Sequence, residues 1–204
     1  MSVADPDAEL MLRVKRGDRA AFEALVERFK QPVLNLIGRT LPDMSEAEDI
    51  AQNVFIQVHR AAPRYEPTAK FSTWLFTIAR NFCLNEIRRR SRHPADSLDA
   101  THPGDEDHPI RQVADRRPTG PTDVLLQNEL EEKIQEALAD LPENQRTAIL
   151  LCRQHELSYE DIARVLGCSL SATKSLIHRG RETLKDRLKA YLRTGDWQAD
   201  DPQL

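Results

Sequence analysis

Apolar residues recur at helical spacing along most of the chain, and this periodicity limits the possible folds more than any other feature. The i, i+3, i+4, i+7 pattern of a helix with one buried face is met early by Phe22, Leu25, Val26 and Phe29. No segment alternates apolar and polar residues for long enough to form a strand. The sequence therefore predicts an all-α fold of two small helical domains joined by a linker.

Residues 1–92 are expected to form the first of these domains, the first lobe. Its expected helices are Ala8–Arg16, a helix that runs into Pro32, a third segment Pro32–Thr40, the helix Glu46–Arg60, and a long helix from Phe71 that ends in Arg88–Arg90. Ser45 and Glu48 have the spacing of a capping box, in which each side chain satisfies a free backbone donor. The segment 62–70, with Pro63 and Pro67, is predicted to be a loop.

Residues 93–124 differ in kind from the rest of the chain. Positions 93–122 hold five prolines and six acidic residues, with few apolar ones, so a flexible acidic linker is expected. The second lobe, residues 125–193, is expected to hold four helices: Leu126–Leu141, a helix with Pro142 at its first position, Tyr159–Leu166, and Leu170–Leu192. Residues 194–204 form a short acidic tail.

The charge distribution indicates two local contacts with a polyanion. The 204-residue chain has a formal net charge of −4, but residues 80–92 carry five arginines against one glutamate. Residues 174–189 carry six basic residues against two acidic ones. A membrane span, needing about 20 apolar residues, is not expected, because the longest apolar run is Ala148–Cys152. The acidic start and three scattered cysteines favour the cytoplasm.

The sharpest motif lies at residues 158–181, which have the pattern of a helix-turn-helix. Ala163 allows close helix crossing, Gly167 suits a turn with positive φ, and Ser169 can cap the second helix. The outer face of that helix is predicted to offer base edges and phosphates the side chains of Lys174, Ser175, His178, Arg179 and Arg181. Two further DNA-contact candidates are Ser171 and Thr173, although Thr173 falls on the predicted inner face. Leu176 has two interpretations: it belongs to the core, or it touches a thymine methyl group.

The long helix of the first lobe combines aromatic residues with a basic end. Aromatic rings beside cations can stack unpaired bases while the cations hold phosphates. However, spacing of three or four is more often that of a core, and composition alone favours the core for Phe71, Trp74 and Phe82. No phosphate-binding glycine loop, zinc-binding His pair or nucleophile elbow is present, so neither a cofactor nor a metal nor a catalytic residue is expected.

Together the two motifs resemble the bacterial sigma-70 family, in its extracytoplasmic-function group. The first lobe is similar to the family's second conserved region at residues 47–60 and 71–81, and the second lobe to the fourth region at 141–146, 157–167 and 174–181. The resemblance implies a non-enzymatic protein that binds core RNA polymerase, on its clamp and flap, and recognises promoter DNA. It also implies an anti-sigma factor that covers both lobes.

The resemblance further implies a division of contacts among the helices. Polymerase would bind the polar face of Glu46–Arg60, with candidates Glu48, Asp49, Gln52, Asn53 and Gln57. The opened −10 element would meet residues 63–81 and the arginine run, with candidates Lys70, Phe71, Trp74, Arg80, Asn81, Arg88 and Arg89. The −35 element would meet residues 171–181. The linker would run through polymerase, as a nucleic-acid mimic or simply as a solvated tether.

Three positions depart from the family pattern. Leu176 stands where an arginine is common, which affects base preference, and Asn85 stands where an aspartate is usual. Gly180 replaces a common alanine, at an expected cost under about 1 kcal/mol. Two rival functions remain open: a stand-alone helix-turn-helix regulator, which would bind duplex DNA tightly without polymerase, and a helical interaction protein that has lost DNA binding.

Overall fold

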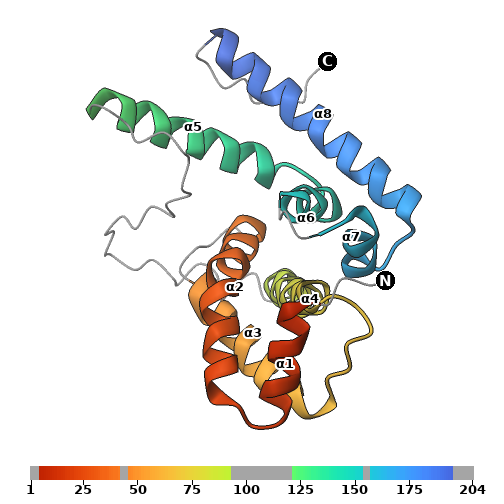
Figure 1. Ribbon diagram of the computed structural model, residues 1–204. Helices are drawn as coiled ribbons and strands as arrows, with labels where there is room; N and C mark the ends of the chain where they lie inside the picture. The colour runs from red at the N-terminus through yellow and green to blue at the C-terminus, as the bar shows by residue number, and fades with distance from the viewer. Residues whose placement is uncertain (1–4, 42–45, 93–120, 154–156, 195–204) are drawn as a thin grey trace.

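The computed structural model describes residues 5–41, 46–92, 121–153 and 157–194, and within these ranges every regular element is a helix. The first lobe occupies the lower half of Figure 1 and the second lobe the upper half. Their elements are α1 (Pro6–Lys15), α2 (Arg19–Thr40), α3 (Ala47–Ala61), the 3-10 turn η1 (Ala62–Arg64), α4 (Phe71–Arg92), α5 (Pro121–Ala139), α6 (Glu143–Cys152), α7 (Tyr159–Leu166) and α8 (Leu170–Thr194). The predicted all-α fold is confirmed.

The first lobe is built around the apolar stripes of α2, α3 and α4. The stripe predicted for α3 is buried throughout, at Ala47, Ile50, Ala51, Val54, Phe55 and Val58. Phe29 of α2 meets Phe71 of α4 edge to face, with ring centroids 5.3 Å apart. Such pairs stabilise a core beyond the area that they bury.

Two local expectations for this lobe differ from the structure. Pro32 does not divide the chain, because α2 is one helix that continues through it. A proline removes one helical hydrogen bond, but Phe29, Val33 and Leu36 keep the same buried face on both sides of it. The N-cap of α3 is Glu46, which makes no side-chain capping bond. Ser45, the expected cap, lies outside the described residues.

The second lobe begins earlier than expected and has a different cap on α6. Helix α5 starts at Pro121, inside the segment expected to be linker. Pro142 is the N-cap of α6, with extended backbone at ψ 139°, rather than its first helical residue. Residues 93–120, which make up most of the expected acidic linker, lie outside the described residues.

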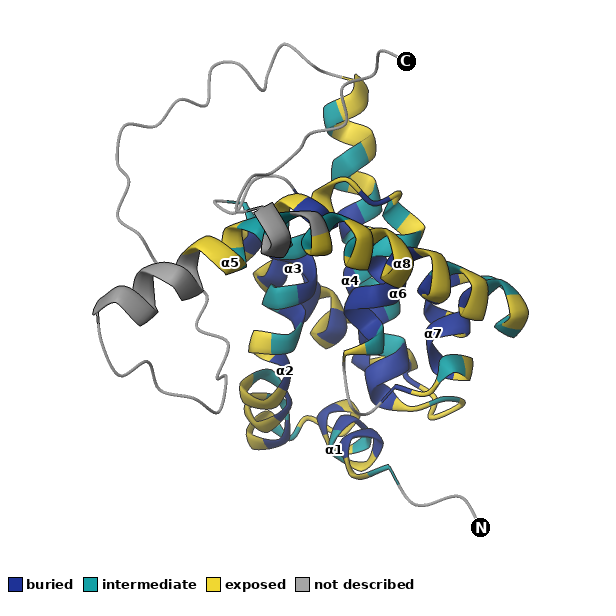
Figure 2. Cartoon of the chain, turned by 90° about the horizontal axis from the view of Figure 1, so that it is seen from above, coloured by how far each residue is buried: buried dark blue, intermediate teal, exposed yellow. Residues whose placement is uncertain are grey.

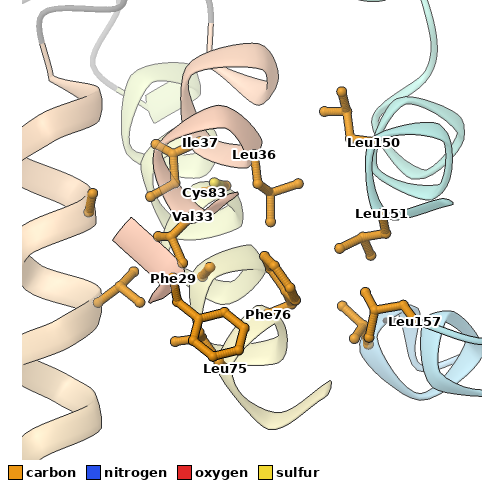
Figure 3. Packing of buried hydrophobic residues seen from close by; sticks show 14 of the residues in the cluster. Phe29, Val33, Leu36, Ile37, Leu75, Phe76, Cys83, Leu150, Leu151 and Leu157 are labelled. Carbon is orange, nitrogen blue, oxygen red and sulfur yellow. The ribbon is translucent and has the colours of Figure 1, made fainter. Parts of the chain in front are cut away.

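The two lobes share one hydrophobic core. In Figure 3, Leu36 of α2 and Phe76 of α4 point across the boundary toward Leu150 and Leu151 of α6 and toward Leu157. All five belong to a single cluster of buried residues. Helix α4 packs on α7, and α2 packs on α5 and α6. The lobes are therefore closed on one another through apolar side chains, an arrangement that the sequence did not predict.

Candidate nucleic-acid interface

The helix-turn-helix is formed by α7 and α8, with a sharp turn between them. Gly167 has φ +67° and ψ 35°, the left-handed backbone that glycine adopts without steric cost. The Ser169 hydroxyl accepts a hydrogen bond from the Ala172 backbone N–H at 3.2 Å. Both features were predicted from the sequence.

A capping box that the sequence analysis missed begins α7. The Ser158 side chain accepts from the Asp161 backbone N–H at 3.1 Å, and the Asp161 carboxylate accepts from the Ser158 N–H at the same distance. The Ser-x-x-Asp spacing could have revealed it. This box satisfies two backbone donors at the start of the helix-turn-helix.

One face of α8 is exposed and carries polar and basic side chains. Six of the seven expected DNA-contacting residues there are exposed: Ser171, Lys174, Ser175, His178, Arg179 and Arg181. Four of them, Lys174, Ser175, His178 and Arg179, line a shallow hollow of about 340 Å³. Within the described part of the chain, Lys174 and Arg179 form no ion pair. This face is open to a ligand.

The seventh residue, Thr173, lies on the opposite side of α8 and is 0% exposed. Its hydroxyl lies 3.1 Å from the Ser169 carbonyl oxygen, to which it donates, and 3.2 Å from the Cys168 sulfur. It therefore holds the turn from inside instead of facing DNA. Leu176 is half-buried beside the buried Ile177, so both interpretations of Leu176 remain compatible with the structure.

Gly180 lies where α8 crosses α6. A Cβ atom added at this position would stand 2.9 Å from Cγ1 of Ile149, closer than side-chain atoms approach one another. From helix propensity alone, Gly180 is expected only to lower helix stability slightly. In the structure, the absence of a side chain at Gly180 lets α8 pack directly on α6.

The basic surface of the first lobe is occupied by carboxylates and amides of the same chain. Lys70 Nζ lies 3.4 Å from the Asp161 carboxylate of α7. Arg80 donates to the Asn144 side-chain oxygen at 2.9 Å and lies 3.7 Å from the Glu143 carboxylate. These contacts join the expected −10 surface to the second lobe.

The arginine run at the end of α4 is held within the first lobe. Arg89 contacts the Glu86 carboxylate at 2.8 Å, and Arg90 contacts the same carboxylate at 2.9 Å. Both guanidinium groups also approach Glu46. Hydrogen bonds from Arg89, followed by those from Arg90, lower the pKa of Glu86 to about 2. Arg88 and Asn81 are exposed.

The aromatic residues of α4 pack mainly against their own lobe. Phe71 is 0% exposed, and Trp74 is half-buried with its ring 5.0 Å from that of Tyr65. Phe71 thus supports α4 from within the core, the alternative that composition favoured. Tyr65, which the sequence analysis did not single out, is 3% exposed, and burial raises its pKa to about 12.

The outer face of α3 presents the polar residues predicted to bind a partner protein. All five are exposed: Glu48, Asp49, Gln52, Asn53 and Gln57. Ile56 lies among them and is 46% exposed, although its side chain is large and apolar. An apolar centre within a polar rim is typical of protein–protein contacts. The sequence signal was present, because Ile56 falls outside the buried stripe of α3.

Comparison with known proteins matches both lobes to one family. Residues 25–93 match Sigma-70 region 2, and residues 131–184 match Sigma-70, region 4. The RNA polymerase sigma-H factor of Pseudomonas aeruginosa is 36% identical over 95% of this chain and 99% of its own length. The ECF RNA polymerase sigma factor SigW of Bacillus subtilis is also 36% identical, over 87% of this chain and 94% of its own. This chain belongs to the sigma-70 family, in its ECF group.

Solved structures of sigma factors also match this fold. The sigma factor RpoE of Bartonella quintana, solved with the anti-sigma factor NepR, matches with a TM-score of 0.64 at 26% identity, over 82% of this chain and 96% of that one. CnrH, solved with the cytosolic domain of CnrY, matches in fold with a TM-score of 0.67 at 23% identity, over 91% of this chain and 99% of that one. The resemblance inferred from the sequence is confirmed.

The described residues of the sigma factor contain neither a metal-ligand cluster nor a helix of membrane-spanning character. Among its described residues, no group of three or more His, Cys, Asp or Glu side chains is placed to hold a metal ion. None of the helices in the described ranges is long and apolar enough to span a bilayer. Cys83 is buried, whereas Cys152 and Cys168 are partly exposed.

Proposed function

We propose that this sigma factor binds core RNA polymerase and directs promoter-specific initiation in the cytoplasm, without catalysing a reaction itself. The observation that carries the proposal is the pairing of two different exposed faces in one family member. The α3 face is polar with an apolar centre at Ile56, and the α8 face is basic. The first suits a protein partner and the second suits duplex DNA.

The α8 face would bind the −35 element in the major groove. Lys174, His178 and Arg179 are exposed together on one side of the helix, as a recognition helix requires. A bidentate arginine contact with guanine contributes about 1–3 kcal/mol of discrimination. Leu176 at the edge of this face offers a methyl-rich surface instead of the guanidinium that is common in the family.

The α4 surface would hold the opened −10 strand. Arg80 and the exposed Arg88 supply charge for phosphates, and the exposed Asn81 supplies an amide for reading an unpaired base. Unstacking costs a few kcal/mol per base, so these contacts act together with polymerase binding. Phe71 supports this surface from the core.

The closed arrangement of the lobes supports an additional step. The −10 and −35 elements lie about 25 base pairs apart, roughly 85 Å along the duplex at about 3.4 Å per step. In the closed form, Lys70 Nζ is 3.4 Å from Asp161, which belongs to the helix-turn-helix. One duplex cannot reach both surfaces in that form. The lobes would therefore separate when polymerase binds.

An anti-sigma factor is the proposed inhibitory partner. RpoE of Bartonella quintana was solved in complex with an anti-sigma factor, NepR. CnrH was solved in complex with the cytosolic domain of CnrY. Such a partner would cover the α3 face and the basic surface of α4, which polymerase and DNA otherwise need.

Run-off transcription with core RNA polymerase, with and without the full-length protein, tests the proposal on a library of promoter-like templates. Initiation that needs both components, with enriched sequences at −35 and −10, is the expected result. Core binding without initiation would favour an interaction protein. Tight duplex binding without core binding would favour a stand-alone regulator.

A further inference from the structure

Helix α1 contacts both ends of the loop that connects η1 to α4. Lys15, in the last turn of α1, donates from Nζ to the Tyr65 carbonyl oxygen at 2.9 Å. Asp5, the N-cap of α1, accepts from the Phe71 backbone N–H at 2.7 Å. Tyr65 begins the loop of residues 65–70, and Phe71 is the first residue of α4.

Asp5 caps two helices with one carboxylate. Its Oδ1 accepts from the Asp7 N–H of α1 at 3.0 Å, while its Oδ2 takes the Phe71 N–H of α4. The first N–H groups of a helix have no partner within the helix, so Asp5 satisfies donors of both. The start of α4 is thereby tied to a residue 66 positions earlier.

Helix α1 is itself anchored to the body of the first lobe. Asp7 is 3% exposed and contacts Arg28 of α2 at 2.9 Å. Met11 and Val14 are also buried against the lobe. Asp5 and Lys15, at opposite ends of this anchored helix, are therefore fixed points for the loop.

The loop is braced internally as well. The Thr68 N–H donates to the Glu66 carbonyl oxygen at 2.8 Å, across Pro67. The Tyr65 ring packs against Phe71 and Trp74, with ring centroids 6.3 and 5.0 Å away. Glu66, Pro67 and Thr68 remain exposed. The exposed tip of the loop, residues 66–68, is therefore supported by α1 and by the packed rings of Tyr65, Phe71 and Trp74.

We infer that α1 is a clamp that positions the loop of residues 65–70, and that Asp5 and Lys15 are positioning residues for base selection in the opened −10 strand. The inference rests on the proposed function. Base selection depends on hydrogen-bond groups held within about 0.5 Å of their productive positions. Phosphate contacts carry no sequence information. Releasing the loop therefore reduces discrimination between bases more than it reduces overall affinity.

The test uses full-length protein bound to core polymerase. The probes are fluorescent single-stranded oligonucleotides carrying the −10 sequence enriched in run-off transcription, each alternative base at every position, and an abasic strand. Asp5→Ala and Lys15→Met are compared with Arg13→Met, which removes from α1 the same positive charge as Lys15→Met does. Arg13 contacts Asp18 at 2.7 Å and serves as the matched control. Lys15→Arg keeps a donor and tests rescue.

We expect Asp5→Ala to reduce the preference for the favoured base about fivefold to tenfold, the effect of losing one helix cap. Lys15→Met is expected to reduce it about threefold, as loss of one exposed hydrogen bond does, with Lys15→Arg near wild type. The affinity of both variants for the abasic strand is expected to stay within about twofold of the wild-type affinity. Hydrogen exchange of the Phe71 amide becomes faster in Asp5→Ala.

Unchanged base preference in both variants would overturn the clamp, as would an equal loss for every strand including the abasic one. Lys15→Met decides the matter if Asp5→Ala does not fold, because Lys15 is exposed. The proposed function fails separately, and the clamp with it, when the wild-type complex shows no base preference at any position. Preference in the wild type that survives in the variants rejects the clamp alone.

Discussion

The two basic surfaces of this sigma factor have opposite environments. On α8, Lys174 and Arg179 are exposed and form no ion pair within the described residues. On the first lobe, Lys70, Arg80 and Arg89 are each within reach of a carboxylate of the same chain. In Figure 2 the outer side of α8 is largely exposed.

This difference indicates that the α8 face is free to bind DNA, whereas the basic surface of the first lobe must first release side chains of the same protein. The α8 face needs no rearrangement to meet a rigid duplex. The α4 surface must first exchange Asp161, Glu143 and Asn144 for phosphates or bases. Recognition of −35 is therefore expected to depend on contact chemistry, and recognition of −10 on release from an internal competitor.

The largest expected effect comes from removing the open surface. The double variant Lys174→Ala and Arg179→Ala should weaken binding of a −35 duplex by about 3 kcal/mol, more than a hundredfold, because a base contact and a phosphate contact are lost. Electrophoretic mobility shifts with the polymerase complex measure this. Lys189→Ala, further along the same helix, is the control. Equal weakening in that control would show that general charge, and not the α8 face, determines binding.

Removing the internal partners of Arg80 should strengthen DNA binding instead of weakening it. Glu143→Gln with Asn144→Ala removes two partners of Arg80. We expect binding of a −10 single strand by the free protein to tighten by about 1 kcal/mol, roughly fivefold, with −35 duplex binding unchanged. Glu136→Gln on α5 removes one carboxylate that pairs with Lys133 and is the matched control. No gain in anisotropy titrations would mean that Arg80 is not restrained.

The position of α8 can be tested at its contact with α6. Gly180→Ala gains about 1 kcal/mol of helix propensity, but its Cβ would stand 2.9 Å from Ile149. Overpacking a filled contact costs about 1–3 kcal/mol. A net destabilisation of about 1 kcal/mol is expected in thermal or urea unfolding. Stabilisation instead would show that the Ile149 side chain moves aside. Thr183→Ala on the exposed side of α8, which also removes a hydroxyl that donates to the Arg179 carbonyl oxygen, is the comparison.

The smallest effect concerns the arginine run. The folded pKa of Glu86 is lowered to about 2 from an ordinary value of 4.5. A lowered carboxyl pKa contributes stability that is complete above pH 4.5 and is lost as the pH falls toward 2. Because Arg89, the main partner of Glu86, has a side chain that is 53% exposed, solvent screening limits the contribution to under about 1 kcal/mol. Glu86→Gln should flatten that part of an acid unfolding curve, and an unchanged curve would refute the assignment.

Local features of the fold were predictable because their causes are local. The turn at Gly167 and the cap at Ser169 follow from residue type and position within a short segment. The buried stripe of α3 follows from periodicity in the same way. Continuity of α2 through Pro32 was not predicted, because burial on both sides outweighs one lost hydrogen bond.

Contacts between segments far apart in the chain could not be predicted from the sequence. Periodicity shows that Leu36 and Phe76 lie on apolar stripes, but it does not show which helix each stripe covers. The contact of Asp5 with Phe71 joins residues that no short-range pattern connects. The expected DNA residues Phe71 and Thr173 proved to be buried, because helical spacing does not distinguish a supporting position from a contacting one.

The apolar boundary between the lobes has a thermodynamic consequence. Leu36, Phe76 and Leu151 are at most 2% exposed in the closed form, so separating the lobes transfers their surface to water. Hydration of apolar surface raises the heat capacity. The opening equilibrium should therefore be curved with temperature, and cooling should weaken this part of the closed state. Temperature itself thus acts on how readily this initiation factor opens.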